Sequence, residues 1–298
     1  MNCSSPAGIG ALGKTVRGMS SHLAMITLAL AGCMSQASAV LIGFETTSGY
    51  QVGNLYNQPG TAGATKWGAI PNAINNNLLS VTSGAGVGGS QAIVAQANAT
   101  VAAGVYQYVP TSTDLGGVFS NASSQIAFSF QLKWDSLGPS GTYTGRFFVG
   151  NTLSTQAGDV LRLSWGANGQ LIYTLSDTTV RFATNAGGMN FAAAAGSFYT
   201  VSGVLDYATK SYTLSVNGVQ QTDNLGSSNI SFVNAAGANV NSNFEIQTQL
   251  NNSANFRPWT LDNLNYALVP EPSAVALALL AGGMLILVRR ARGKVQSS

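Results

Sequence analysis

The central part of this 298-residue chain lacks the side chains most often used in catalysis and metal binding. The only histidine, His22, and the two cysteines, Cys3 and Cys33, all precede residue 40. Residues 40–268 therefore contain no thiol and no imidazole. This excludes disulfides, thiolate or imidazole metal sites, and catalysis by Cys–His or Ser–His pairs in this part of the chain.

Charged residues are also scarce, at 8% of the chain, against about a quarter in an average soluble domain. Residues 40–268 carry nine acidic and seven basic residues, a net charge of −2. The basic residues are Lys66, Lys133, Arg146, Arg162, Arg181, Lys210 and Arg257. A nucleic-acid binder needs clustered cations that replace counterions on phosphates, so these scattered cations argue against a nucleic-acid partner. The 35 glycines and the Asn-rich composition favour an all-β exported protein with many turns.

The N-terminal segment has the pattern of a secretory signal. Two basic residues precede the apolar stretch 23–31, and small residues follow it. Ala37 and Ala39 occupy the two small positions of a signal-peptidase site. We therefore expect 1–39 to be a signal peptide and the mature chain to begin at Val40.

A second interpretation of the same segment stays open. Residues 30–33, Leu-Ala-Gly-Cys, resemble a bacterial lipobox, in which the cysteine is acylated and becomes the first residue. We favour cleavage after Ala39 because a strand pattern begins directly at Val40. The other end of the chain also supplies a membrane anchor.

Residues 269–294, close to the C-terminus, have three parts in a fixed order. A short motif comes first and consists of Val269, Pro270, Glu271, Pro272 and Ser273. An uncharged stretch of sixteen residues, 273–288, follows it and is just short of the usual 17–25 residues of a membrane-spanning helix. The tail 289–294 contains Arg289, Arg290 and Arg292, which predict a cytoplasmic C-terminus and can snorkel to extend the span.

This arrangement resembles the PEP-CTERM sorting segment of exported bacterial proteins. The resemblance implies a Gram-negative host that secretes exopolysaccharide. It also implies an exosortase as partner, which recognises the motif 269–273 and removes the helix 273–288 from the membrane-anchored precursor. The two prolines would also stop a helix from continuing into the preceding domain, and the two interpretations are compatible.

Residues 40–268 show period-two alternation of apolar and polar side chains. The pattern predicts strands at 125–134, 160–165, 170–175, 211–216 and 244–248, each with a wet outer face. Asn168-Gly169, Ala208–Lys210 and Asn217-Gly218 predict hairpin turns between them. Many short strands joined by turns predict an all-β, antiparallel β-sandwich or barrel.

Three stretches, 42–60, 198–220 and 259–273, resemble the concanavalin A-like and laminin-G-like jelly rolls of exported bacterial proteins. The resemblance implies an antiparallel jelly-roll β-sandwich over 40–268, with another β-sandwich as the alternative. It also implies that the last strand, 261–267, lies beside the first, 40–44.

The concanavalin-like fold also includes glycosidases, which place carboxylates on one strand as Glu-x-Asp-x-x-Glu, about 5 Å apart across the bond in retaining enzymes. The nearest candidate here is Glu245, but Gln247 and Leu250 occupy the positions of the other two carboxylates. We therefore expect no enzymatic activity, and glycoside hydrolysis is a remote alternative.

Lectin-like binding uses aromatic platforms beside amide and carboxylate groups. Trp67, Tyr143 and Trp259 are candidate platforms, whereas Trp134 and Trp165 fall in apolar registers and are expected in the core. Asp262-Asn263 has two interpretations: oxygen ligands for Ca²⁺, or a polar pair that kinks the last strand. The second is the commoner arrangement, so no cofactor is expected.

Together these patterns predict an exported, exosortase-sorted, non-enzymatic protein of the cell surface or extracellular matrix, associated with exopolysaccharide. A carbohydrate-binding, lectin-like module is the alternative.

The sorting segment generates a prediction for the native host. Replacing Pro270, Glu271 and Pro272 together with alanine should leave uncleaved protein in the inner membrane, because the rigid extended motif is what a processing enzyme would grip. Fractionation and mass spectrometry of the C-terminus measure the outcome. Normal release of the triple variant, or recovery of 273–298 peptides from the mature extracellular protein, would show that the segment is not a sorting signal.

Overall fold

The computed structural model describes residues 39–56, 58, 67–70, 78–96, 104–110, 125–139, 143–150, 159–174, 180–184, 191–233, 243–250 and 256–269. The body of the chain forms one compact unit, Ser38–Val269. The predicted signal peptide before Ala39 and the sorting segment from Pro270 onward, including the predicted helix 273–288, lie outside the described residues. Within the described ranges no helix is long and apolar enough to cross a membrane.

Strands form two antiparallel sheets. The ten-stranded sheet has the order β14 (Val219–Gln220), β13 (Ser211–Val216), β12 (Phe198–Asp206), β7 (Gln125–Trp134), β17 (Trp259–Val269), β5 (Ala92–Ala95), β4 (Leu79–Thr82) and β2 (Gly53–Asn54). Two further strands join it, β1 (Ala39–Ile42) beside β17 and β15 (Ile230–Ser231) beside β13. The seven-stranded sheet has the order β11 (Val180–Phe182), β10 (Leu171–Thr174), β9 (Asp159–Gly166), β8 (Tyr143–Gly150), β16 (Asn243–Leu250), β6 (Gly104–Pro110) and β3 (Trp67–Ile70).

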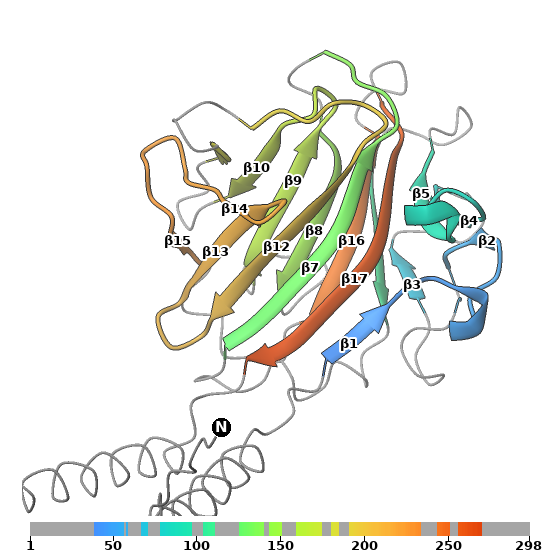
Figure 1. The fold of residues 1–298 in the computed structure, drawn as a ribbon, viewed down its shortest axis with the longest axis horizontal. Coiled ribbons are helices and arrows are strands. Elements are labelled where there is room, and N and C mark those ends of the chain that lie inside the picture. The colour runs from blue at the N-terminus through green and yellow to red at the C-terminus, as the bar shows by residue number, and fades with distance from the viewer. Residues whose placement is uncertain are drawn as a thin grey trace, which may run out of the picture. The chain divides into compact units, whose positions relative to one another are not determined.

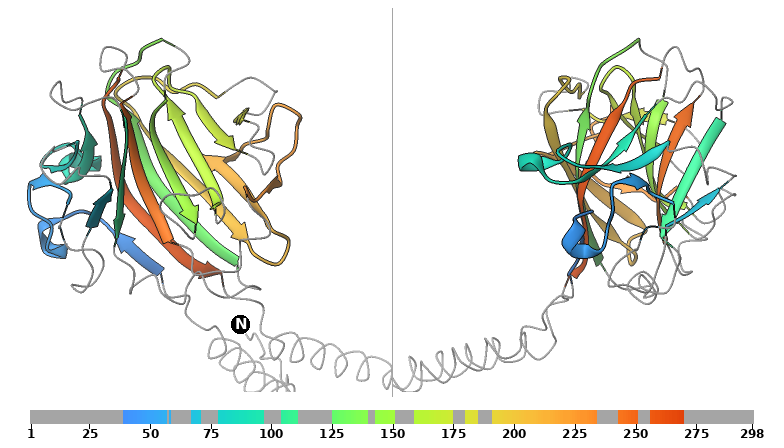
Figure 2. Two further views of the ribbon diagram at one scale, coloured as in Figure 1. Left: turned by 180° about the vertical axis from the view of Figure 1, so that it is seen from behind. Right: turned by 90° about the vertical axis from the view of Figure 1, so that its right-hand side faces the viewer.

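The sheets lie face to face as two layers, and the chain passes repeatedly between them (Figures 1 and 2). The last two strands each insert between strands from earlier in the chain: β16 lies between β6 and β8, and β17 lies between β5 and β7. This nesting is the connectivity of a jelly roll. The predicted all-β, antiparallel jelly-roll sandwich is therefore confirmed.

Alternation along the central strands of the ten-stranded sheet follows the sequence pattern. Side chains of β7 alternate between buried and half-buried over all ten residues, and β13 alternates in the same way. Apolar residues of β7 thus face the second sheet while Ser, Gln and Lys face outward, as period-two alternation requires. The strands predicted at 125–134 and 211–216 are confirmed with these faces.

The predicted wet outer face is wrong for β9 and β10. Ser164, Ile172 and Thr174 occupy the polar or outward positions of these strands, yet all three are buried. The cause is the size of the neighbouring side chains on the same face. Ser164 is paired with Arg146 on one side and with Ile172 on the other, so longer side chains shield it from water.

Tryptophan side chains join the two sheets. Trp134 of β7 donates from Nε1 to the carbonyl of Gly166 on β9 at 2.9 Å, and Trp259 of β17 donates to the carbonyl of Thr144 on β8 at 2.8 Å. The rings of Trp259 and Trp165 meet edge to face with centroids 4.9 Å apart. The expected core positions of Trp134 and Trp165 are confirmed, since both are fully buried.

The structure has hairpin turns at the three places where the sequence predicts them. Asn217 and Gly218 have φ of 49° and 79°, so the pair forms a two-residue turn of the I′ kind between β13 and β14. The loop between β9 and β10 is one residue longer. The amide of Gly166 donates to the carbonyl of Gln170, which closes the loop 167–169, and within it only Gly169 has a positive φ. The carboxylate of Asp206 accepts from the amides of Ala208 and Thr209 at 2.9 and 3.0 Å and so shapes the turn between β12 and β13.

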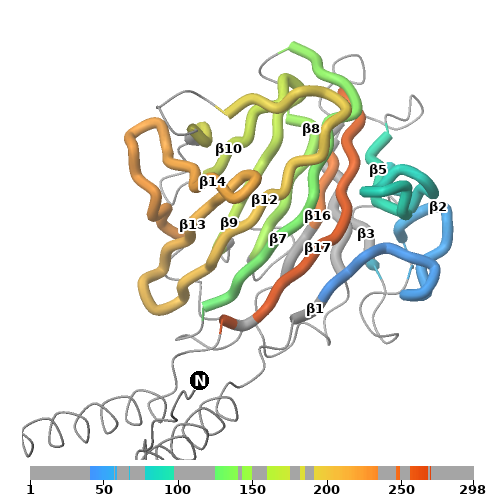
Figure 3. The backbone as a smooth tube through the Cα atoms, in the orientation of Figure 1, coloured from blue at the N-terminus to red at the C-terminus, as the bar shows by residue number. Residues whose placement is uncertain are grey.

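The first and last strands are neighbours, as expected. Ala39 pairs with Ala267 and Ile42 with Leu264, and β1 runs along the lower part of β17 in Figure 3. Further along β17 the register shifts between Asp262 and Asn265, where Asn263 has a φ of 50°. The irregularity lets β17 pair with β5 and with β1 along one edge.

Gly145 on β8 provides a test of this packing. A β-carbon at Gly145 would overlap the indole ring of Trp165, which the surrounding core holds in place. We expect Gly145→Ala to lower the free energy of unfolding by about 1–3 kcal/mol, the usual range for overpacking. Urea denaturation of the full chain measures the effect.

Gly43→Ala is the matched control, because the nearest atom to a β-carbon there, Cγ of Glu45, is 3.9 Å away. If the two variants unfold at the same urea concentration, Trp165 does not pack against β8 as described.

Candidate functional site

A group of polar and aromatic side chains lies on the outer face of the seven-stranded sheet, across β16, β8 and β9. Gln247, Arg146 and Ser164 form one row of paired residues. Phe148 and Arg162 are paired in the next row. The intervening residues Ile246, Phe147 and Leu163 are buried in the core, which places the other set on the outside. Together with Tyr143, we call Arg146, Phe148, Arg162, Ser164 and Gln247 the outer-face cluster.

Each arginine of the outer-face cluster lies against an aromatic ring. The guanidinium carbon of Arg146 is 5.4 Å from the ring centroid of Tyr143, and that of Arg162 is 5.2 Å from the centroid of Phe148. Both distances are within the roughly 6 Å range of cation–π attraction. The rings therefore hold the two guanidinium groups close to the sheet surface.

Arg146 has few partners for the donors it carries. Its Nη1 donates to Oε1 of Gln247 at 3.4 Å, a long bond, and Gln247 is its only hydrogen-bond partner among the described residues. Its Nε is buried and has no hydrogen-bond partner in the described part of the chain. An arginine has five N–H donors, so the described residues use only a small part of the hydrogen-bonding capacity of Arg146.

The electrostatic environment of Arg146 is unfavourable for its charge. Burial and the nearby charge of Arg162 both lower the pKa of Arg146 below its usual range. Strand pairing explains the proximity, since Arg146 and Arg162 lie on adjacent strands in successive rows of the same face. Arg146 is half-buried and could donate hydrogen bonds to oxygen atoms of a ligand, while Phe148, Ser164 and Gln247 of the outer-face cluster are buried.

Glu245, the candidate carboxylate, lies on β16 at the position paired with Phe148, next to the outer-face cluster. Gln247, in the position of a second carboxylate, is a buried amide held by Arg146. Leu250 pairs with Gly104 at the end of β16. The only other acidic residue in a strand of this sheet, Asp159, is on β9, with β8 intervening. The backbone positions of Glu245 and Asp159 therefore lie on strands that are not adjacent.

Two of the three predicted aromatic platforms are wrong. Trp67 and Trp259 are fully buried, and each indole N–H has a partner inside the protein. Trp67 donates to the hydroxyl of Tyr50 at 2.9 Å, and Trp259 donates across the sandwich to β8. Tyr143 remains as a half-buried aromatic ring, and it belongs to the outer-face cluster.

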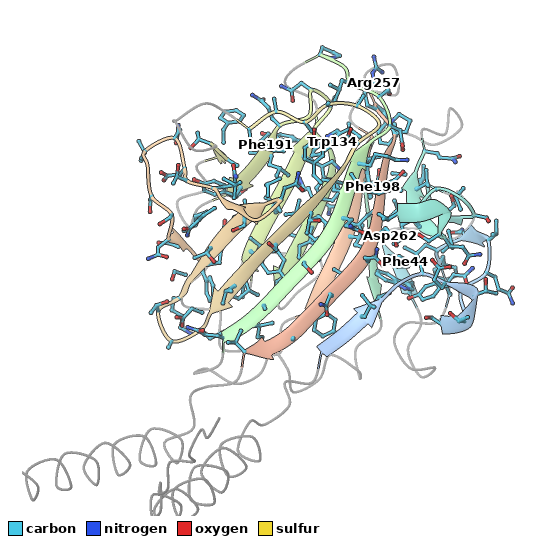
Figure 4. The ribbon with its side chains drawn as sticks, in the orientation of Figure 1. Phe44, Trp134, Phe191, Phe198, Arg257 and Asp262 are labelled. Atoms are coloured by element: carbon cyan, nitrogen blue, oxygen red, sulfur yellow. The ribbon has the colours of Figure 1, made fainter. Side chains whose placement is uncertain are left out.

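Asp262 holds a loop rather than presenting its oxygens outward. Oδ2 of this fully buried residue accepts from the amide of Val87 and the hydroxyl of Ser90, both at 3.0 Å. Oδ1 accepts from the amide of Asn263 at 2.7 Å. Figure 4 shows Asp262 at this irregular part of β17, close to Phe44. The polar pair thus kinks the last strand, and the described residues contain no group of three acidic, His or Cys residues suited to a metal.

The residues of the predicted export signals lie at or beyond the edge of the sandwich. Val269 is the last residue of β17 and pairs with Gln125, while Ala39 is the first residue of β1. Pro270, Glu271, Pro272 and Ser273, the basic Arg289, Arg290 and Arg292, and Ala37 lie outside the described residues.

Sequence reasoning missed Arg146, Arg162 and Gln247 as a group. Each is a polar residue within a strand, and Arg146 and Gln247 are 101 positions apart. The available signal was that two of the seven cations of residues 40–268 fall close together in the chain. Their shared face depends on the register of three strands, which alternation alone does not supply.

No protein-family model matches the sequence, and no curated protein matches it. Among solved structures the chain is similar to the binding domain of Paraclostridial Mosquitocidal Protein 1, at 12% identity, TM-score 0.46, over 80% of this chain and 52% of that one. It is similar to peanut lectin at 10% identity and TM-score 0.45, over 80% of this chain and 100% of the lectin. A sialidase matches at 12% identity and TM-score 0.41, over 67% of this chain, which spans only 16% of that enzyme. Because these TM-scores lie below 0.5, the fold assignment rests on the strand pairings of the chain itself.

Proposed function

We propose that the protein is an exported, non-enzymatic glycan-binding protein of the cell surface or extracellular matrix, which binds exopolysaccharide through the outer-face cluster. The observation that carries the proposal is Arg146, a charged side chain with unused donors beside the ring of Tyr143. The route of export is the one the sequence predicts, with signal peptide 1–39 and sorting segment 269–294.

The chemistry of the outer-face cluster suits a sugar. Glycans present hydroxyl oxygens that accept hydrogen bonds and C–H faces that pack on aromatic rings. Arg146 supplies donors, and Tyr143 supplies a ring that is still partly exposed. Sites for small polar ligands typically combine an apolar or aromatic wall with a few placed polar groups.

Binding without catalysis fits the acidic residues of the same sheet. Glycoside hydrolysis uses two carboxyl groups about 5–9.5 Å apart across the bond. Asp159 and Glu245 are separated by β8, and their pairing partners on β8 are Gly150 and Phe148, so they are also offset along the strands. Adjacent strands are about 4.8 Å apart, so their backbones are separated by two strand spacings in addition to this offset.

The positions of the chain ends support delivery from a membrane-attached precursor. Ala39 and Ala267 are paired, so the leader and the sorting segment leave the sandwich from adjacent strands. Val269, the first residue of the sorting motif, is the last residue of β17. An exosortase acting at 269–273 would therefore cut directly beside the folded domain and release it.

The proposal predicts that an aromatic ring contributes to glycan binding if it lies in the outer-face cluster, and not if it lies on the ten-stranded sheet. Tyr143→Ala should weaken retention of the full chain on purified exopolysaccharide from the producing cells about twofold to twelvefold, because an aromatic contact contributes about 0.5–1.5 kcal/mol. Affinity electrophoresis measures the change. A melting temperature close to that of the unchanged protein would show that the fold is intact.

Phe198→Ala is the matched control, since Phe198 is a half-buried ring on the ten-stranded sheet with Lys133 5.0 Å from its centroid. It should bind as the unchanged protein does. Absence of retention for the unchanged protein would leave a matrix role without glycan binding, and equal weakening by both substitutions would remove the outer-face cluster as the site.

A further inference from the structure

We infer that the outer-face cluster selects glycans that carry carboxylate groups, as in polymers of uronic acids, and that Arg146 is the residue that binds the carboxylate. The inference rests on the proposed glycan binding and names the class of sugar. It is carried by the unused donors of Arg146 and by the position of Arg162 beside it.

Arg146 presents a geometry that a carboxylate matches. Its Nε is buried without an acceptor, so a ligand can contact only the rest of the guanidinium, and its one hydrogen bond to a described residue, from Nη1 to Gln247, is long at 3.4 Å. A guanidinium donates two parallel N–H bonds from neighbouring nitrogens, and the two oxygens of a carboxylate accept them in the same plane. A sugar hydroxyl offers a single oxygen and cannot form this paired contact.

The environment of Arg146 also favours an anion, although the backbone position of Glu245 lies in the row of Phe148 and Arg162 on the same face. Arg146 and Arg162 repel each other, and burial increases the cost of the charge on Arg146. Removing a charge from water is costly unless an opposite charge compensates it. A bound carboxylate would compensate that cost and reduce the repulsion, whereas a neutral sugar would do neither.

Residues 40–268 are unsuited to bind polyanions indiscriminately. Residues 40–268 carry a net charge of −2, so a strongly anionic polymer experiences no long-range attraction to this part of the chain. Recognition must then come from short-range contacts at the arginine pair. This distinguishes a carboxylate site from a general cationic surface and predicts poor binding of a sulfated polymer.

The test uses the full chain and three polymers: polygalacturonate, the same polymer after chemical reduction of its carboxyl groups to alcohols, and dextran sulfate. We expect polygalacturonate to bind at least tenfold more tightly than the reduced polymer or dextran sulfate. Arg146→Gln should remove that preference, so that the variant binds polygalacturonate and the reduced polymer equally weakly. Isothermal titration calorimetry measures each affinity.

Lys133→Gln is the matched control, because it removes one positive charge beside an aromatic ring on the opposite sheet. It should leave the preference for polygalacturonate intact. Equal binding of the native and reduced polymers, tight binding of dextran sulfate, or equal losses in the two variants would each overturn the inference. Glycan binding itself is judged separately, by retention on the exopolysaccharide, which can persist when the preference for carboxylate is absent.

Discussion

Two hydrogen bonds between buried indoles and backbone carbonyls hold the two sheets in register, and the outer-face cluster depends on them. Trp134 and Trp259, from the ten-stranded sheet, reach the carbonyls of Gly166 and Thr144 in the seven-stranded sheet. Thr144 lies between Tyr143 and Gly145 on β8, and Gly166 is paired with Tyr143. These two bonds thus fix the end of β8 that carries Tyr143 and Arg146 on its outer face. A buried N–H without an acceptor costs about 1–3 kcal/mol, which ties these carbonyls to their positions.

The scarcity of charge makes the few ionic groups easy to interpret. Lys133 and Asp135 form a salt bridge at 3.0 Å, and Asp262 holds the loop that contains Val87 and Ser90. Asp206 shapes a turn, and hydrogen bonds from Ala208, Thr209 and Gln125 lower its pKa although burial acts in the opposite direction. Against this background Arg146 differs, because its charge is near another cation and its donors are mostly unused.

Much of the sandwich was predictable from alternation and turn residues. The strand 125–134 alternates over its whole length, and Asn217-Gly218 forms the expected turn, because both patterns are local. The strand β8 was not predicted: Gly145 interrupts it, and the adjacent residues Phe147 and Phe148 are both buried although they face opposite sides. Bulky side chains on both faces conceal a period of two.

The site was less predictable than the fold because it depends on contacts between distant segments. Trp67 and Trp259 were expected to be exposed, yet their partners, Tyr50 and Thr144, become adjacent only after folding. Arg146 and Gln247 lie on strands separated by most of the second half of the chain. The sequence gives the type of each aromatic or polar residue in a strand. Strand pairing and the packing of the two sheets determine which face the residue occupies and which residues surround it.

The most direct test of the account is to observe the side-chain Nε–H signal of Arg146 by nuclear magnetic resonance while a galacturonate oligosaccharide is added. If a glycan carboxylate is bound at the outer-face cluster, this signal should shift in proportion to occupancy, together with the side-chain amide of Gln247. The side chain of Lys133, on the opposite sheet, should stay unchanged. Saturable binding with its largest shifts around Lys133 and Phe198, and none at Arg146, would contradict the account.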